Sequence, residues 1–130
     1  MSISIEELEA VPVFTALSSE ELSSVAASAV RMDVPEAGIE LTREGDFGHS
    51  VFVVVAGTAQ VRVDGTAVRD LTAGDAFGEI AVLASGRRTA SVVSTTPMTL
   101  ITLFKRDVWK LEQENPAFGE QLRKLTEQPL

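Results

Sequence analysis

The feature that most constrains the fold is a run of short, strand-like segments that begins at about Val30 and ends at Phe104. The hydrophobic period over this region is two residues, and turn-forming residues separate the segments at short intervals. The segments cover residues 30–34, 39–43, 51–56, 59–63, 67–71, 90–94 and 98–104. Many short strands at this spacing are typical of a small barrel or jelly roll. The sequence therefore predicts a mostly β protein with an antiparallel, jelly-roll-like β-roll at its centre.

One dipeptide is the strongest turn signal in this region. Asp64-Gly65 stands between Val63 and Thr66, with strand-like residues on both sides. Asp and Gly both tolerate a positive φ, which a two-residue hairpin turn requires. We expect a tight β-hairpin at this position.

Helical patterns flank the β region on both sides. Before it, Ser4 with Glu7 and Ser18 with Glu21 have the S-x-x-E spacing of a capping box, which marks the first turn of a helix. After it, apolar residues recur at helical spacing in two sets, Val108 and Leu111, then Phe118, Leu122 and Leu125. Asn115-Pro116 separates these sets, and because Asn is a good N-cap and Pro a good first helical residue, we expect a second helix to begin there.

The chain shows no internal repeat, low-complexity tract or linker, so we expect one domain over residues 1–130. Its expected parts are N-terminal helices over 1–29, the β-roll over 30–104 and C-terminal helices over 105–130.

Composition excludes several classes of function. The chain has 11 Lys and Arg against 19 Asp and Glu, and a net charge of −8 disfavours direct binding to nucleic acid, which requires cations against phosphates. There is no cysteine and only one histidine, His49, so a thiolate site or the histidine cluster of a cupin-type metal oxygenase cannot be built. We also find no nucleophile and base in a plausible arrangement, and we expect neither enzyme activity nor a bound metal.

The sequence carries no targeting or membrane signal. The first ten residues are acidic where a leader peptide is basic and apolar, and the longest apolar run, residues 51–56, is too short to span a bilayer. We therefore expect a cytoplasmic chain with no membrane segment.

The stretch over residues 74–90 departs from the strand pattern and has the residue types of an anion site. Gly78 precedes a run of good helix formers, and the first backbone N–H groups of such a helix bind anions. After a turn, Arg88 could add a bidentate, charge-assisted donor. Glu79 beside an anion is explained if it accepts hydrogen bonds from hydroxyls, such as those of a ribose. The alternative is that Glu79 and Arg88 form a structural ion pair and that Gly78 only serves a turn.

Two motifs carry a resemblance to a known family. The first is Phe77-Gly78-Glu79-Ile80-Ala81-Val82-Leu83, followed after a short turn by Arg88-Thr89-Ala90. The second is Arg43-Glu44-Gly45-Asp46, followed by Val51-Phe52-Val53-Val54-Val55-Ala56-Gly57. They resemble the phosphate-binding cassette and an upstream signature of the cyclic-nucleotide-binding domain family. That family is shared by bacterial catabolite-activator-type regulators, protein kinase regulatory subunits and cyclic-nucleotide-gated channels, and the likeness covers nearly the whole chain.

The resemblance implies a β-roll with a short phosphate-cassette helix, and a cyclic nucleotide held between the roll and the C-terminal helices. Glu79 would accept a hydrogen bond from the ribose 2′-hydroxyl, and Arg88 would pair with the exocyclic phosphate oxygens. The implied ligand-binding residues are Gly78, Glu79, Ile80, Ala81, Arg88, Thr89 and Ala90. Many relatives have proline directly before the arginine, whereas this chain has Arg87, which we interpret as a surface charge.

Two further questions concern the base of the nucleotide and the residues that could cover it. The Thr89 hydroxyl would lie near both phosphate and base, where it can contact the 2-amino group of guanine, so we expect both cAMP and cGMP to bind, with cAMP as the physiological ligand. Phe118, Leu122 and Leu125 have two readings: a lid over the purine, or residues that simply pack on the roll.

We therefore expect a cAMP or cGMP sensor or regulatory domain that needs no cofactor. It would signal to a downstream effector protein or domain by repositioning its C-terminal helices, as a monomer or weak homodimer. The chain could be a stand-alone sensor or the sensor of a longer protein. The alternative is a degenerate scaffold, which keeps the fold as a protein interaction module and binds no nucleotide.

Overall fold

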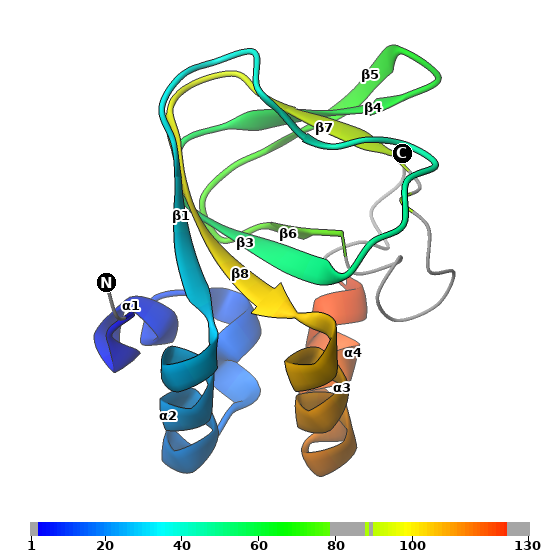
Figure 1. Cartoon of the computed structure of the whole chain (residues 1–130). Helices are drawn as coiled ribbons and strands as arrows, with labels where there is room; N and C mark the ends of the chain where they lie inside the picture. Colours follow the sequence, from blue (N-terminus) through cyan, green and yellow to red (C-terminus); the bar gives the residue numbers. More distant parts are fainter. Residues whose placement is uncertain (1–2, 79–87, 89, 125–130) are drawn as a thin grey trace.

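The β region forms two antiparallel sheets (Figure 1). The computed structural model describes residues 3–78, 88 and 90–124, and all bounds refer to that part of the chain. One sheet has the order β1-β8-β3-β6, formed by β1 (Val30–Val34), β8 (Met98–Phe104), β3 (Ser50–Ala56) and β6 (Ala76–Phe77). The other has the order β2-β7-β4-β5, formed by β2 (Glu40–Thr42), β7 (Ser91–Ser94), β4 (Ala59–Val63) and β5 (Thr66–Leu71). The strand pairs are antiparallel, which confirms the predicted β-roll.

The short strand β6 is absent from the sequence-based expectation. It pairs with β3 at the sheet edge, where Phe77 lies opposite Phe52 and Ala76 opposite Val53. Two residues are too few to show a hydrophobic period, so this strand is defined only by its distant partner. The pairing brings the start of the cassette motif against the middle of the sheet.

The predicted hairpin is confirmed. It joins β4 to β5, and Asp64 and Gly65 have φ values of 52° and 78°. Positive φ at both central residues matches the right-handed twist of the flanking strands.

The N-terminal helices begin where the capping patterns predict. They are α1 (Ile5–Glu9), the 3₁₀ helix η1 (Pro12–Ala16) and α2 (Ser19–Ser28). At the start of α2 the capping box is complete, because the Glu21 N–H donates to Ser18 Oγ at 3.2 Å and the Ser18 N–H donates to Glu21 Oε1 at 2.9 Å. At α1, Ser4 Oγ accepts from the Glu7 N–H at 3.1 Å.

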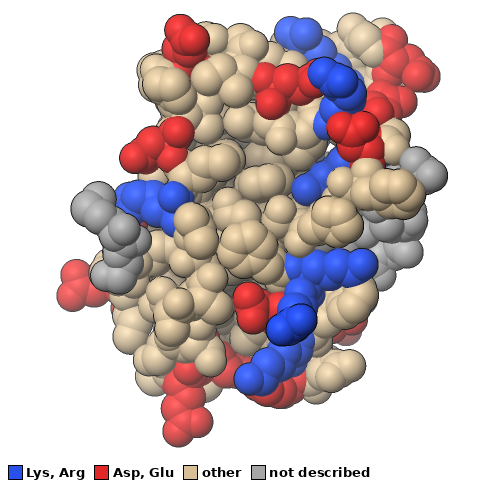
Figure 2. All heavy atoms as spheres, viewed as in Figure 1, with Lys and Arg blue, Asp and Glu red and all other residues tan. Residues whose placement is uncertain are grey.

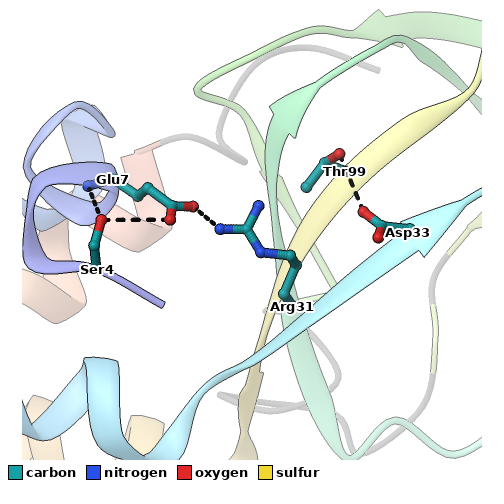
Figure 3. Close-up of polar contacts among 5 residues, drawn as sticks. All are labelled: Ser4, Glu7, Arg31, Asp33 and Thr99. Atoms are coloured by element: carbon teal, nitrogen blue, oxygen red, sulfur yellow. Dashed lines mark hydrogen bonds and ion pairs between the residues drawn. The ribbon is translucent and has the colours of Figure 1, made fainter. Parts of the chain in front are cut away.

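Figure 3 shows how α1 is joined to the first sheet. The Ser4 hydroxyl donates to the Glu7 carboxylate at 3.3 Å, and that carboxylate pairs with the guanidinium of Arg31 on β1. Farther along β1, Asp33 accepts a hydrogen bond from the Thr99 hydroxyl of β8 at 3.3 Å. The Glu7 side chain thus bridges from α1 to the sheet.

The C-terminal region forms two helices, α3 (Lys105–Glu114) and α4 (Pro116–Lys124), with the predicted break at Asn115. The sequence predicts that the Asn115 side chain caps the second C-terminal helix. In the structure, the amide of this side chain donates to the N-terminal helical region. Its Nδ2 donates to the Ala16 carbonyl at 2.8 Å and to Glu21 Oε1 at 3.1 Å. The helix junction is therefore tied to the N-terminal helices. Within the described ranges, no helix has the length and apolar character needed to cross a membrane.

The middle strands of the first sheet, β3 and β8, are buried along most of their length on both faces. Figure 1 shows the helices on one side of this sheet and the second sheet on the other. Along β3, Val51 and Val53 belong to a core cluster shared with the helices, whereas Phe52 and Val54 belong to a cluster inside the roll. Because strand side chains alternate between faces, one strand supplies both cores.

Candidate functional site

The side chain of Arg88 is the centre of the candidate site. Only 9% of the residue is exposed, and its Nη1 donates to the carbonyl oxygens of Gly78 at 2.8 Å and Ser50 at 3.0 Å. A buried guanidinium is costly unless it is hydrogen-bonded, and these two carbonyls satisfy part of that need. The contacts join Arg88 to the end of β6 and the start of β3.

The main chain of Arg88 is held by the upstream motif. The Arg88 N–H donates to the Asp46 carbonyl at 2.7 Å, and the Gly45 N–H donates to the Arg88 carbonyl at 2.9 Å. The same loop is joined to the neighbouring strand, because the Glu44 N–H donates to Ser91 Oγ at 2.9 Å. The two sequence motifs, about 40 residues apart, therefore meet at one residue.

Gly78 has a conformation that requires glycine. Its φ is +89°, a region that L side chains rarely adopt. A Cβ at this position would overlap the Arg88 guanidinium and lie 3.0 Å from the Ser50 carbonyl oxygen. The Arg88 guanidinium thus occupies the space that a side chain at position 78 would need.

One aromatic ring lies beside the guanidinium, and a second ring stacks on the first. Arg88 Cζ lies 5.5 Å from the ring centroid of Phe52, within the range of a cation–π contact. The Phe52 ring in turn stacks on Phe77, with centroids 5.0 Å apart. The sequence places Phe52 in a family motif without giving its side chain a role, and the structure places it in the core cluster inside the roll. The Phe52 ring therefore borders the position that the guanidinium occupies.

A polar hollow of about 410 Å³ borders Arg88 on the side of the upstream motif. It is lined by Glu40, Leu41, Thr42, Arg43, Asp46, Phe47 and Arg88. Glu40 Oε1 accepts a hydrogen bond from Arg43 Nε at 2.8 Å, and this contact raises the pKa of Arg43 above its ordinary value. Arg43 and Arg88 both line this hollow.

The remaining implied ligand residues divide between described and undescribed parts of the chain. Ala90 is half-buried, packs against the roll core and accepts a hydrogen bond from Thr42 Oγ1 at 3.3 Å. The residues that lie outside the described ranges are Glu79, Ile80, Ala81, Arg87, Thr89 and Leu125. The expected cassette helix falls in the same part.

Two of the proposed lid residues are fully buried against the N-terminal helices. Phe118 and Leu122 belong to the helical core cluster, and Phe118 stacks on Phe14 with centroids 6.3 Å apart. This placement supports the packing interpretation for the state described here, and contact with a purine stays a prediction.

Comparison with known proteins identifies the domain family to which this site belongs. The family model for the cyclic nucleotide-binding domain matches residues 35–115. A cyclic nucleotide-gated potassium channel of Rhizobium etli is 33% identical over 115 residues, which cover 88% of this chain and 32% of the channel. A cAMP-dependent protein kinase regulatory subunit of Neurospora crassa is 38% identical over 106 residues, which cover 80% of this chain and 27% of that protein. The chain thus spans about a third or less of the length of these curated relatives.

Solved structures show the same fold. The catabolite activator protein of Thermus thermophilus superposes with a TM-score of 0.74 at 28% identity, covering 88% of this chain and 56% of that one. The regulatory domain of Toxoplasma gondii PKA, solved with cAMP, superposes with a TM-score of 0.81 at 22% identity, covering 95% and 48%. The fold, the two motifs that meet at Arg88 and the match over residues 35–115 agree, and the chain belongs to the cyclic nucleotide-binding domain family.

Proposed function

We propose that this chain is a sensor domain that binds a cyclic nucleotide, cAMP or cGMP, and that Arg88 binds its phosphate. The observation that carries the proposal is the placement of Arg88. Its main chain is clamped by Gly45 and Asp46, and one side-chain nitrogen is anchored on two carbonyls. Anchoring one nitrogen sets the plane of the planar fork, so the other donors of the guanidinium have a defined direction.

Electrostatics gives a second reason for this role. The chain has a net charge of −8, so an anionic ligand is repelled at long range and needs a local cationic site. A buried arginine supplies such a site, because a charge-assisted hydrogen bond is stronger where water is excluded.

The rest of the proposed site follows from the family resemblance. Glu79 would accept a hydrogen bond from the ribose 2′-hydroxyl, and the N–H groups of Gly78, Ile80 and Ala90 would surround the phosphate. Thr89 would contribute to base contact. The curated relatives include a cAMP-dependent regulatory subunit and a cGMP-dependent protein kinase, which supports testing both nucleotides. We expect both to bind, with cAMP as the physiological ligand.

We further propose that the chain acts as one domain and reports ligand through its C-terminal helices to a cytoplasmic effector. A ligand can shift a conformational equilibrium only if its affinities for the two states differ. Asn115 offers a route for such a shift, since it links the α3–α4 junction to the Ala16 carbonyl and to Glu21.

Isothermal titration with cAMP and cGMP tests this function, with Arg88→Ala as the main variant. We expect both nucleotides to bind the wild type. Removing Arg88 deletes a charge-assisted contact worth about 1.5–3 kcal/mol, so affinity should fall roughly ten- to a hundredfold. Arg88→Lys keeps the charge but loses the planar fork, and it should also weaken binding.

Arg87→Ala is the matched control, because it removes the same charge from the neighbouring position. It should change affinity little, and an equal or larger loss there would contradict the assignment of Arg88. Thermal melting without ligand must show that the variants are folded. If the folded wild type binds neither nucleotide, the degenerate scaffold is the better description.

A further inference from the structure

A groove of about 450 Å³ lies between α2 and α3, which stand side by side under the first sheet (Figure 1). On the α2 side it is lined by the short side chains of Ser24, Ala27 and Ser28. Val25 and Leu111 also line it, and both belong to the helical core cluster. Because the α2 side chains are short, they leave open space in front of α3. We name this space the α2–α3 groove.

The charges that line the groove are mostly negative. Among the described residues, its lining includes the carboxylates of Glu20, Glu21, Asp107 and Glu114 and one ammonium group, that of Lys110. Lys105 and Arg106, the other two cations of α3, are not among the lining residues, and α2 contains no Lys or Arg. Figure 2 shows Asp and Glu atoms at the end of the molecule where Figure 1 places α2 and α3.

Three of these carboxylates are not compensated within the described part of the chain. No hydrogen bond or ion pair joins the side chain of Glu20, Asp107 or Glu114 to another described residue, and Lys110 forms none either. Glu21 instead accepts the hydrogen bonds of the helical junction. The groove therefore attracts a positively charged group from outside.

The spacing of the carboxylates favours an extended occupant over a single small cation. Asp107 and Glu114 are seven residues apart on α3, roughly 10 Å along the helix axis, and Glu20 and Glu21 line the groove from the other helix. One small cation cannot contact carboxylates this far apart. An extended peptide covers roughly the same 10 Å in three residues, so successive basic side chains can each meet one carboxylate.

We propose that the α2–α3 groove docks a basic segment of a partner protein, with Arg side chains of that segment paired with Asp107 and Glu114. The planar fork of arginine matches a carboxylate and is more weakly hydrated than the ammonium of lysine. The groove contains none of the candidate nucleotide residues, so the proposal goes beyond nucleotide binding and does not depend on it.

The sign of the charge disfavours other large occupants. A nucleic acid and an anionic membrane carry the same sign of charge as the groove and would be repelled. A second copy of this chain has a net charge of −8, which disfavours self-association at this place as well.

Fluorescence anisotropy of a labelled synthetic peptide measures the contact. The peptide carries Arg at every third position among alanines, and the control peptide has Gln for each Arg. We expect the Arg peptide to bind the wild-type chain with and without cAMP, and the Gln peptide not to bind.

Paired variants locate the peptide on the groove. Asp107→Asn with Glu114→Gln should weaken binding of the Arg peptide about tenfold. The matched control, Glu36→Gln with Asp70→Asn, removes the same charge from exposed positions of the roll and should leave affinity unchanged. Thermal melting checks that both double variants are folded.

Lys110 gives a test in the opposite direction. Lys110→Gln removes the cation that competes with the peptide for these carboxylates, and it should tighten binding about threefold. Arg62→Gln on β4 removes the same charge far along the chain and should have no effect.

Four results would overturn the proposal. They are no binding of the Arg peptide up to about 1 mM, equal losses in the two double variants, equal tightening by Lys110→Gln and Arg62→Gln, and displacement of the peptide by an equal concentration of spermidine, which would assign the groove to a small cation. Failure of nucleotide binding leaves all these results unchanged.

Discussion

At the scale of single residues, the contact between Gly78 and Arg88 determines whether the guanidinium can occupy its place. Gly78→Ala would add a Cβ that overlaps the guanidinium, at a φ of +89°. We expect cAMP affinity to fall by about tenfold or more, because the arginine must move from the position proposed for phosphate binding. Stability should also fall by about 1–2 kcal/mol, since a non-glycine residue in this region is strained.

Gly38→Ala separates these two effects. Gly38 has a φ of +87°, nearly the same as Gly78, but a Cβ there would meet nothing within 4 Å. It should cost similar stability and leave cAMP affinity unchanged by titration calorimetry. If both variants bind equally well, the packing of Gly78 on Arg88 has no role in the site.

The cassette residues led us to expect Gly78 and Arg88 close together, and the structure shows them in contact. Their part in a ligand site stays a prediction. The groups that hold the guanidinium were not predictable in the same way. The Gly78 and Ser50 carbonyls are backbone atoms, so no residue type marks them. Their role depends on the pairing of β6 with β3, which brings together residues far apart in the chain.

At the scale of elements, local signals were reliable. The capping box of α2 and the Asp64-Gly65 hairpin were both predicted and both found, because each involves residues within a few positions of one another. Strand order was not predicted, since adjacent strands such as β1 and β8 are joined by pairing over about 70 residues. The contacts of the Asn115 amide with Ala16 and Glu21 were not predicted either, because they join elements that are far apart in the chain.

Glu21 makes the stability of this helical junction depend on pH. The hydrogen bond from the Ser18 N–H, followed by that from the Asn115 side chain, lowers the pKa of Glu21 below its ordinary value of 4.5. A carboxylate with a lowered folded-state pKa stabilises the protein above its unfolded pKa and loses that contribution as pH falls. Glu21→Gln should therefore reduce stability at pH 7, and the difference from wild type should shrink below about pH 4.5.

Urea denaturation of both proteins between neutral and acid pH measures this difference. Glu20→Gln is the control, since it removes the same charge from the same helical turn. A difference between wild type and Glu21→Gln that stays constant down to pH 3 would show that the carboxylate charge has no part in the junction.

At the scale of the whole molecule, the sheet that contains β3 separates two hydrophobic cores. The sequence of β3 shows a single apolar run and does not distinguish the two cores. Residues 51–56 are apolar without interruption, and such a run is expected where a strand is buried on both faces. Val53 packs with the helices and Val54 packs inside the roll, and both are fully buried. Because neighbouring residues of β3 belong to different cores, displacing this strand would disrupt both cores at once. The helices and the roll should therefore unfold together.

Val53→Ala and Val54→Ala test this coupling as a matched pair. Each removes two buried carbon atoms, which should cost about 2 kcal/mol and lower the melting temperature by roughly 7 °C. Trp109 lies on α3, so its fluorescence follows the helical side of the molecule. We expect the Trp109 transition to move equally in both variants and to coincide with the transition seen by far-UV circular dichroism, as a two-state unfolding requires. If the Trp109 transition responds to Val53→Ala but not to Val54→Ala, the helices unfold separately from the roll, and β3 does not couple them.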